Sequence, residues 1–193
     1  MPIRKAPPKK LKPLNRGVTI AYIGDGKGKT TAAVGVATRA AGYGWKVLFF
    51  QFYKSPDWPS GEREALRKLG VDVEVHGQGF VGILGDRKPL AQHKAAAKKA
   101  LDRAWMLIHS GKYQLVVLDE IISCLEQKLF PVSVVVAMLK KHAASPTAKN
   151  VHLVMTGHEK FAALLKQVDL VTEMKMLKHP YYKGFIAVKG IDY

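Results

Sequence analysis

The chain has 193 residues, 48% of them hydrophobic, with 31 Lys and Arg against 15 Asp and Glu, giving a formal net charge of +16. These values fit one well-packed domain rather than two, and they exclude an acidic disordered protein. The single cysteine, Cys124, excludes internal disulfides and favours a reducing compartment, so we expect a cytoplasmic protein. No apolar run approaches the ~20 residues that cross a bilayer, and we expect neither a membrane segment nor a signal peptide.

The positive charge has more than one interpretation. It suits a nucleic-acid binder, a site for polyanionic small molecules, or an acidic protein partner. Residues 1–16 contain four prolines, six basic residues and no acid. Proline breaks helices and like charges repel, so this segment is predicted to be an extended or mobile basic arm. It is either a solvated tail or an arm that orders over a bound anion.

From Gly17 onward, short apolar runs alternate with helix-like segments. Strands are predicted at 17–23, 45–53, 71–76, 113–120, 151–157 and 169–177, and helices at 31–42, 61–70, 86–109, 131–143 and 159–168. The runs 45–53 and 113–120 are nearly continuously apolar, as in strands buried on both faces, whereas 71–76 alternates and is more exposed. Residues 55–61 and 77–86 are predicted loops, the second one mobile, and 179–193 is an irregular tail.

The sharpest motif is G-D-G-K-G-K-T-T at 24–31, between a predicted buried strand and a predicted helix. Glycines let backbone N–H groups turn toward a polyphosphate, and the helix N-terminus adds positive potential. Lysine supplies a mobile charge and a threonine hydroxyl can bind Mg²⁺. We therefore predict that ATP is bound by Gly24, Asp25, Gly26, Lys27, Gly28, Lys29, Thr30 and Thr31.

This loop is a shortened variant of the usual phosphate-loop spacing, G-x-x-x-x-G-K-[ST], because Ile23 stands five positions before Gly28. With the alternating elements, it predicts an α/β fold of the phosphate-loop NTPase, RecA-like type, spanning 17–193. The sheet is expected to be mostly parallel, with helices on both faces.

Asp119 and Glu120 end the predicted strand 113–120. Carboxyl ends of parallel strands share one edge of a sheet, where ligands bind. An acidic pair ending a strand is often only a turn or a helix cap, but beside a phosphate loop it can hold Mg²⁺. We predict Thr30, Glu120 and Asp119 as metal ligands.

Weaker candidates follow other strands. Gln51 and Lys54 could face the same edge, although solvated loop positions are the simpler interpretation. His158 lies at a strand end near the ligand edge and is otherwise a cap or an exposed residue. Cys124 and the run 134–138 are predicted to be core.

Taken together, these motifs resemble the ATP:corrinoid adenosyltransferases of the bacterial cobalamin pathway. The resemblance covers the chain from about Gly17 to its last residue. The matching pieces are GDGKGKTTAA (24–33), QFYK and WPSGE (51–62), GFVG (79–82), VVLDE (116–120), TGH (156–158), DLVTEM (169–174) and KHPYYKGFIAVKGIDY (178–193). The G-I-D-Y ending and the shortened loop are the most specific of these.

The resemblance implies that cobalt(I) of a corrinoid attacks the 5′ carbon of ATP and expels inorganic triphosphate, with Mg²⁺ bound to the nucleotide. Such a reaction needs in-line positioning, charge neutralisation and exclusion of water rather than a general base. It implies catalytic roles for Lys29, Thr30 and Glu120, and corrinoid contacts for Phe80 and Trp58. It further implies a homodimer and an acidic, flavodoxin-like electron donor.

The chain departs from the family pattern at two positions. Gly82 stands where members carry a tryptophan that shields the lower face of cobalt, so another aromatic such as Trp58 or Tyr182 takes that role, or the corrinoid is presented differently. His158 stands where an arginine is usual, and neutral histidine offers a phosphate one donor instead of a charged fork.

Two other functions are compatible with parts of the sequence. One is a phosphate-loop ATPase or kinase, which would release orthophosphate or transfer a phosphoryl group. The other is a nucleic-acid binding module, motivated by the charge, but the basic residues are spread over helices without interleaved aromatics. We rank nucleic-acid binding last.

Overall fold

The computed structural model describes residues 10–12, 14–82 and 86–193. Its centre is a six-stranded sheet in which every pairing is parallel and the strand order is β3-β2-β4-β5-β1-β6. The strands are β1 Thr19–Ile23, β2 Val47–Gln51, β3 Asp72–Val75, β4 Leu115–Asp119, β5 His152–Thr156 and β6 Leu170–Glu173. The prediction of an α/β fold with a parallel sheet is confirmed.

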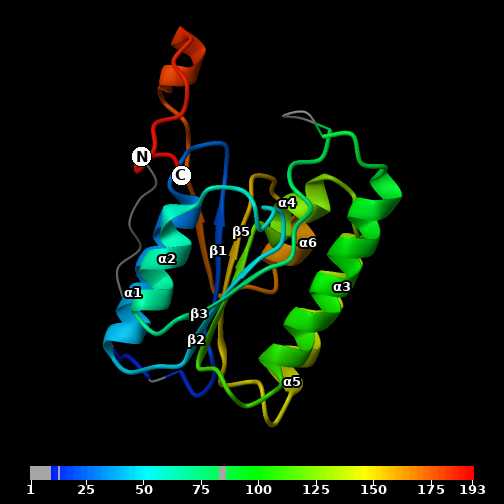
Figure 1. Ribbon diagram of the computed structural model, residues 1–193. Coiled ribbons are helices and arrows are strands. Elements are labelled where there is room, and N and C mark those ends of the chain that lie inside the picture. The colour runs from blue at the N-terminus through cyan, green and yellow to red at the C-terminus, as the bar shows by residue number, and fades with distance from the viewer. Residues whose placement is uncertain (1–9, 13, 83–85) are drawn as a thin grey trace.

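Helices cover both faces of the sheet, as predicted (Figure 1). They are α1 Lys29–Gly42, α2 Gly61–Lys68, α3 Leu90–Ile108, α4 Ile121–Glu126, α5 Val132–Ala144 and α6 Ala162–Leu165, with a 3₁₀ turn, η1, at Pro180–Lys183. α1 and α2 lie on one face, and α3 to α6 on the other (Figure 1). No helix among the described residues has the length and apolar content to cross a membrane.

Alternate side chains of the central strands build two separate cores. In β2, Leu48 and Phe50 pack in the cluster under α3 to α5, whereas Val47 and Phe49 pack in the cluster under α1 and α2. All five residues of β2 and of β4 are buried, as their continuous apolar runs predict. β3 is more exposed, also as predicted, because it is an edge strand.

Several element boundaries differ from prediction for local reasons. α1 begins at Lys29 rather than at residue 31, because Gly28 takes a left-handed conformation, φ 108°, that starts the helix there. β6 ends at Glu173 rather than at 177, because β1, its partner, ends at Ile23. α6 covers only Ala162–Leu165 within the predicted helix 159–168, with Phe161 extended at its N-cap. The short helix α4 was not predicted.

The prediction that residues 134–138 are core is wrong in part. Only Val135 of this run is buried, while Val136 and Met138 are partly buried and Val134 is exposed. The cause is helical geometry: in α5 the buried positions are Val135, Leu139 and His142, so intervening residues face outward. Cys124 is fully buried, which confirms its assignment to the core, and burial raises the pKa of its thiol.

Residues 1–9 and 13 of the predicted basic arm lie outside the described residues. Its other residues are exposed, and Arg16 at its end donates to Asp169 at 2.7 Å, just before β6. Asp169 also accepts from the backbone N–H of Thr19 at 2.9 Å, which joins the end of the arm to the starts of β1 and β6.

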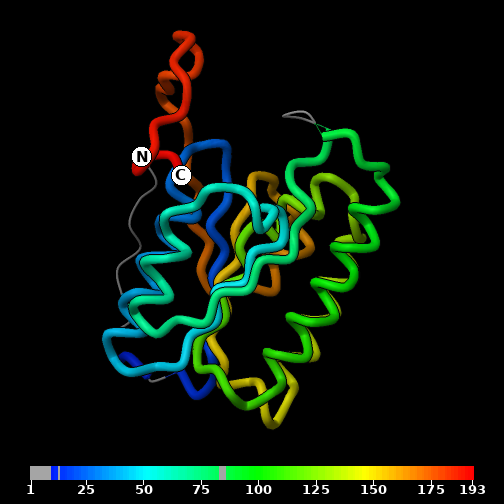
Figure 2. The backbone as a smooth tube through the Cα atoms, in the orientation of Figure 1, coloured from blue at the N-terminus to red at the C-terminus, as the bar shows by residue number. Residues whose placement is uncertain are grey.

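The C-terminal tail, residues 174–193, rises above the carboxyl edge of the sheet, and its last residues return toward the loop between β1 and α1 (Figures 1 and 2). Most of its large apolar side chains are exposed, among them Leu177, Ile186 and Ile191.

Candidate active site

The predicted phosphate loop joins β1 to α1 at the carboxyl edge of the sheet. Two of its backbone N–H groups are already used by the protein: Gly24 donates to His158 O at 2.9 Å, and Gly26 to Met174 O at 2.8 Å. A Cβ at position 26 would lie 2.8 Å from Met174 O, so glycine is required there by the close passage of the chain leaving β6.

Lys29 is buried in the first turn of α1, and its Nζ donates to Gly26 O at 2.8 Å. Burial lowers the pKa of this ammonium, although Glu120, Asp25 and Asp119 oppose that effect. A buried lysine held within its own loop is available to an anion that enters the site, since its charge has no direct carboxylate partner among the described contacts.

A cavity of about 430 Å³ opens in front of this loop. Its lining combines residues from the loop, the segment after β2, the end of β4 and the chain's last residues: Lys27, Gly28, Lys29, Thr30, Thr31, Val34, Lys54, Gly61, Glu62, Glu120, Gly190, Ile191, Asp192 and Tyr193. Of the predicted nucleotide-binding residues, positions 27–31 line the cavity and Gly24, Asp25 and Gly26 do not. Asp25 instead accepts from the N–H of Met176 at 3.3 Å.

Asp119 ends β4 and is completely buried. Its Oδ1 accepts from Thr30 Oγ1 at 2.9 Å and from Thr156 Oγ1 at 2.8 Å, and its Oδ2 accepts from Gln51 Nε2 at 3.2 Å. Burial, together with the neighbouring Glu120, raises the pKa of Asp119. Asp119 therefore does not face the cavity but orients the hydroxyl of Thr30, which does.

Glu120 follows with φ 64°, a left-handed conformation rare for a residue with a side chain. Its N–H donates to Thr156 Oγ1 at 2.8 Å, and Ser123 Oγ donates to its carboxylate. This backbone geometry brings Glu120 to the cavity wall while Asp119 stays buried. Strained backbone at the end of a strand is a feature of functional sites.

The oxygen donors on this wall fit Mg²⁺. Mg²⁺ that accompanies a nucleotide is usually held by one or two protein oxygens, with phosphates and water completing the octahedron. Thr30 and Glu120 supply one hydroxyl and one carboxylate. In the part of the chain that the structure describes, no group of three or more His, Cys, Asp or Glu side chains could hold a metal unaided.

A buried arginine that the sequence patterns do not indicate, Arg63, contacts Gln51, the neighbour of Asp119. Arg63 of α2 donates from Nε to Gln51 Oε1 at 2.6 Å, from Nη1 to Pro56 O and Trp58 O, and from Nη2 to Ser55 O, each at 3.0 Å. Because Gln51 also bonds Asp119, one chain of hydrogen bonds joins the buried acid to the loop that carries Trp58. Gln51 is fully buried, so the solvated interpretation of this residue is wrong.

Phe80 and Trp58, the predicted corrinoid contacts, touch each other. Their rings meet edge to face with centroids 5.1 Å apart, and Tyr53 meets Phe80 in the same way at 5.5 Å. The Tyr53 hydroxyl accepts from the N–H of Val81 at 3.1 Å, which fixes the loop after β3. Tyr182 is elsewhere, packed against His179 and Tyr181 in the tail.

The base of the Phe80 loop is held by Asp86 together with the buried His93. Asp86 accepts from the N–H of Gly82 at 2.9 Å, and His93 Nε2 lies 2.9 Å from the same carboxylate oxygen. Residues 83–85 of the predicted mobile loop 77–86 lie outside the described residues, and the mobility of this loop stays a prediction.

Comparison with known proteins identifies the group to which this chain is related. A family model described as ATP:corrinoid adenosyltransferase BtuR/CobO/CobP matches residues 15–193. The corrinoid adenosyltransferase of Escherichia coli K12 is 35% identical over 178 residues, covering 92% of this chain and 86% of that protein. CobA of Salmonella typhimurium LT2 is 33% identical with the same coverage, and the Pseudomonas aeruginosa enzyme is 33% identical over 92% of this chain and 84% of its own length.

The chain belongs to the ATP:corrinoid adenosyltransferase family. The family expected from the motifs is therefore confirmed, and with it the expectation of a transferase. The α/β fold is consistent with that family.

Two further predicted positions have a defined place in this adenosyltransferase fold. Lys54 lines the cavity and pairs with Glu62 at 2.9 Å, so it faces the ligand edge rather than solvent. The half-exposed side chain of His158 lies 3.3 Å from Ser123 Oγ and 3.7 Å from Glu126, and it is not part of the cavity wall.

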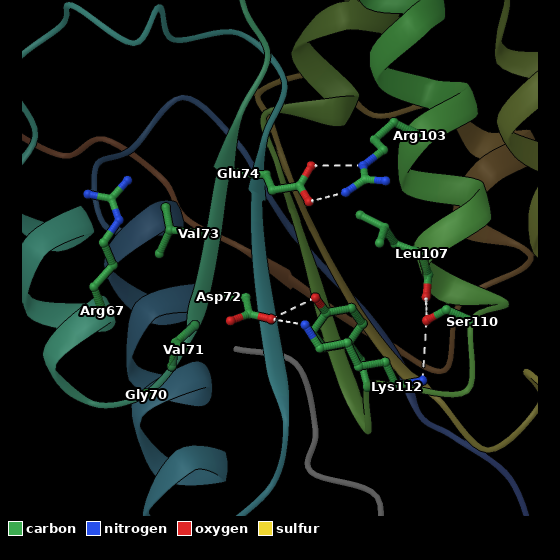
Figure 3. A pocket seen from close by; sticks show the side chains of 11 residues that line it. Arg67, Gly70, Val71, Asp72, Val73, Glu74, Arg103, Leu107, Ser110 and Lys112 are labelled. Atoms are coloured by element: carbon green, nitrogen blue, oxygen red, sulfur yellow. Dashed lines mark hydrogen bonds and ion pairs between the residues drawn. The ribbon is translucent and has the colours of Figure 1, made fainter.

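A second hollow, of about 540 Å³, lies between edge strand β3 and α3 (Figure 3) and shares no lining residue with the cavity at the phosphate loop. Its acids are paired with its own basic residues: Glu74 with Arg103 at 2.8 Å and Asp72 with Lys112 at 2.6 Å. None of the predicted site residues lines it. The cavity at the phosphate loop is therefore the candidate active site.

Proposed function

We propose that this chain transfers the 5′-deoxyadenosyl group of ATP to the cobalt(I) of a corrinoid and releases inorganic triphosphate, with residues 17–193 acting as one catalytic domain. The observation that carries the proposal is that Thr30 of the phosphate loop and Glu120 line one cavity, while buried Asp119 at the end of β4 accepts a hydrogen bond from Thr30, in a chain of the ATP:corrinoid adenosyltransferase family.

The reaction balances without an acid–base pair. Cobalt(I) donates an electron pair to C5′ and a Co–C bond forms, so the cobalt is formally oxidised to cobalt(III). The C5′–O bond breaks, and triphosphate leaves with that bonding pair. The protein must then hold C5′ in line with cobalt and stabilise charge on the leaving oxygen.

The loop residues that line the cavity suit the triphosphate. Lys29 supplies positive charge, Lys27 adds an ammonium that also pairs with Asp192, and the first-turn N–H groups of α1 add the potential of a helix N-terminus. Thr30 and Glu120 would hold Mg²⁺, which would neutralise charge on the triphosphate, while buried Asp119 orients Thr30. Positioning of this kind contributes up to ~7–11 kcal/mol of the barrier in well-oriented reactions.

The corrinoid is proposed to contact Phe80 and Trp58. Trp58 belongs to the segment 54–62, whose two ends, Lys54 and Gly61–Glu62, line the nucleotide cavity, so one ring of the aromatic pair lies in a segment that borders it. Trp58 is a better substitute than Tyr182 for the tryptophan absent at position 82, because Trp58 contacts Phe80 directly. An aromatic face excludes water from a metal's axial position.

Two partners are part of the proposal. The exposed apolar side chains of the tail, with Leu177 94% and Ile186 87% exposed, support a homodimer in which they are covered. Sedimentation of the wild type and of a Leu177→Ser/Ile186→Ser variant tests the homodimer: a monomeric wild type would contradict it.

The net charge of +16 supports docking of an acidic, flavodoxin-like reductant, and reduction rates insensitive to salt would contradict that docking.

The experiment is anaerobic incubation of the protein with cob(I)alamin and MgATP, followed by absorbance. We expect the spectrum of an alkylcobalamin with a light-sensitive Co–C bond. A phosphate-loop ATPase or kinase would instead leave the corrinoid spectrum unchanged while ATP is consumed, and that result would overturn the proposal.

A further inference from the structure

The last four residues, Gly190–Tyr193, lie on the wall of the same cavity as the phosphate loop, although they come from the opposite end of the chain. Figures 1 and 2 show the tail leaving β6, rising above the sheet and returning beside the loop between β1 and α1. The proposed roles of the phosphate loop and the β4 acids do not account for this G-I-D-Y segment.

Asp192 fixes the segment in this place. Its carboxylate pairs with Lys27 of the phosphate loop and accepts from the N–H of Val188 at 2.7 Å, and its own N–H donates to Val188 O at 2.8 Å. The hydrogen bonds from Lys27 and Val188 lower the pKa of Asp192, so it is charged at neutral pH. The turn is closed by a hydrogen bond of 2.9 Å from the N–H of Gly190 to Tyr193 O.

The cavity wall has two chemically different parts. The loop contributes ammonium, hydroxyl and backbone N–H groups, which suit phosphates. The apolar side chains of the wall are Val34 of α1 and, from the chain's end, Ile191 and the ring of Tyr193. The side chain of Ile191 lines the cavity and is 80% exposed, so a bound ligand would cover it.

We propose that Ile191 and Tyr193 contact the nucleoside half of ATP, and that Asp192 is the positioning residue that holds them beside the phosphate loop. The inference rests on the proposed function, since it assigns part of the same site. A nucleoside binds to apolar and aromatic surface with a few polar groups, and a triphosphate binds to cations and N–H groups, so the two halves of ATP match the two parts of the wall.

The test compares two ligands by calorimetry: MgATP, and inorganic triphosphate with Mg²⁺, which lacks the nucleoside. For the Ile191→Ala/Tyr193→Ala variant we expect binding of MgATP about tenfold weaker, as loss of apolar contact from two side chains predicts, and unchanged binding of inorganic triphosphate. The matched control is Tyr43→Ala, an exposed residue just after α1 and outside the cavity, which should bind both ligands as the wild type does.

Three results would overturn the inference: a double variant that binds MgATP like the wild type, one that loses both ligands equally, or a wild type that binds triphosphate as tightly as MgATP. These results are independent of corrinoid chemistry. A wild type that binds MgATP through these residues but never adenosylates cob(I)alamin would refute the proposed function and leave this inference standing. A wild type that binds neither ligand would refute both.

Discussion

Thr30 Oγ1 donates a hydrogen bond of 2.9 Å to Asp119 Oδ1, joining the first turn of α1 to the carboxyl end of β4. Through this bond the buried Asp119 orients the hydroxyl of Thr30, a residue of the cavity wall. Glu120, turned outward by its left-handed backbone, is then the carboxylate that faces the cavity. The two neighbouring acids thus have different roles.

This division of roles predicts the effect of Glu120→Gln. The amide keeps the size of the side chain but loses the charge that we propose binds Mg²⁺, so the Mg²⁺ concentration for half-maximal activity should rise by about tenfold or more. Titration of activity with Mg²⁺ measures it. An unchanged Mg²⁺ dependence would show that Glu120 does not face the metal.

Lys29→Ala should abolish turnover without unfolding the protein. The variant removes the buried ammonium that we propose lies beside the triphosphate, and loss of one such charge stabilisation costs about 10²–10³-fold in rate. Adenosyl transfer and thermal unfolding are measured together, with Lys98→Ala on the exposed face of α3 as control. Near-wild-type turnover of Lys29→Ala would contradict the phosphate-loop assignment.

Phe80→Ala should damage the corrinoid step and spare the nucleotide. The ring packs on Trp58 and Tyr53 and does not line the nucleotide cavity. We expect kcat/KM for cob(I)alamin to fall at least about tenfold, with the affinity for MgATP unchanged. Met106→Ala, an exposed apolar position on α3, serves as control. An equal loss of MgATP binding would count against the assignment.

Arg63→Lys tests the link between the buried acid and the Trp58 loop. Lysine keeps the charge but cannot form the fork of bonds to Gln51 and to the carbonyls of 55–58. If Arg63 positions Trp58, KM for the corrinoid should rise about tenfold and KM for ATP much less. A purely structural role predicts a lower melting temperature with both KM values unchanged, and exposed Arg67→Lys is the control.

The Glu62→Gln variant should be less stable than the wild type, by an amount that depends on pH. Burial alone would raise the pKa of Glu62, but the Lys54 ammonium at 2.9 Å and the hydrogen bonds to the carboxylate together outweigh burial and bring the pKa from 4.5 to about 2. A lowered pKa stabilises the folded state above the unfolded value of 4.5, and this stabilisation is lost as pH falls toward about 2.

The free energy of unfolding of the variant at pH 7 should therefore be about 1–3 kcal/mol lower than that of the wild type. Chemical denaturation over a range of pH measures the difference from the wild type. It should shrink steadily below pH 4.5, the ordinary pKa of the group. A difference that stays constant down to pH 3 would mean that the Lys54–Glu62 pair does not carry the effect.

Much of this architecture could be predicted from local patterns. The apolar runs that became β2 and β4 are buried on both faces, and the phosphate loop meets Asp119 at the end of β4 because parallel strands share a carboxyl edge. The patterns also led to the family, because G-I-D-Y and the shortened loop occur together.

Contacts between distant segments could not be predicted in this way. Arg63 has an ordinary amphipathic position in α2, and only the fold brings the carbonyls of 55–58 around its guanidinium. The ion pair of Lys27 with Asp192 joins two ends of the chain, so no local spacing indicates it. The requirement for glycine at position 26 could not be predicted for the same reason, because it comes from the close approach of Met174 in the distant chain after β6.

The most direct test of the central claim is the identity of the phosphate product formed from MgATP and cob(I)alamin under anaerobic conditions, followed by ³¹P NMR. Attack at the 5′ carbon predicts inorganic triphosphate in a one-to-one ratio with the Co–C bond formed. Release of ADP and orthophosphate, with the corrinoid unaltered, would contradict the account.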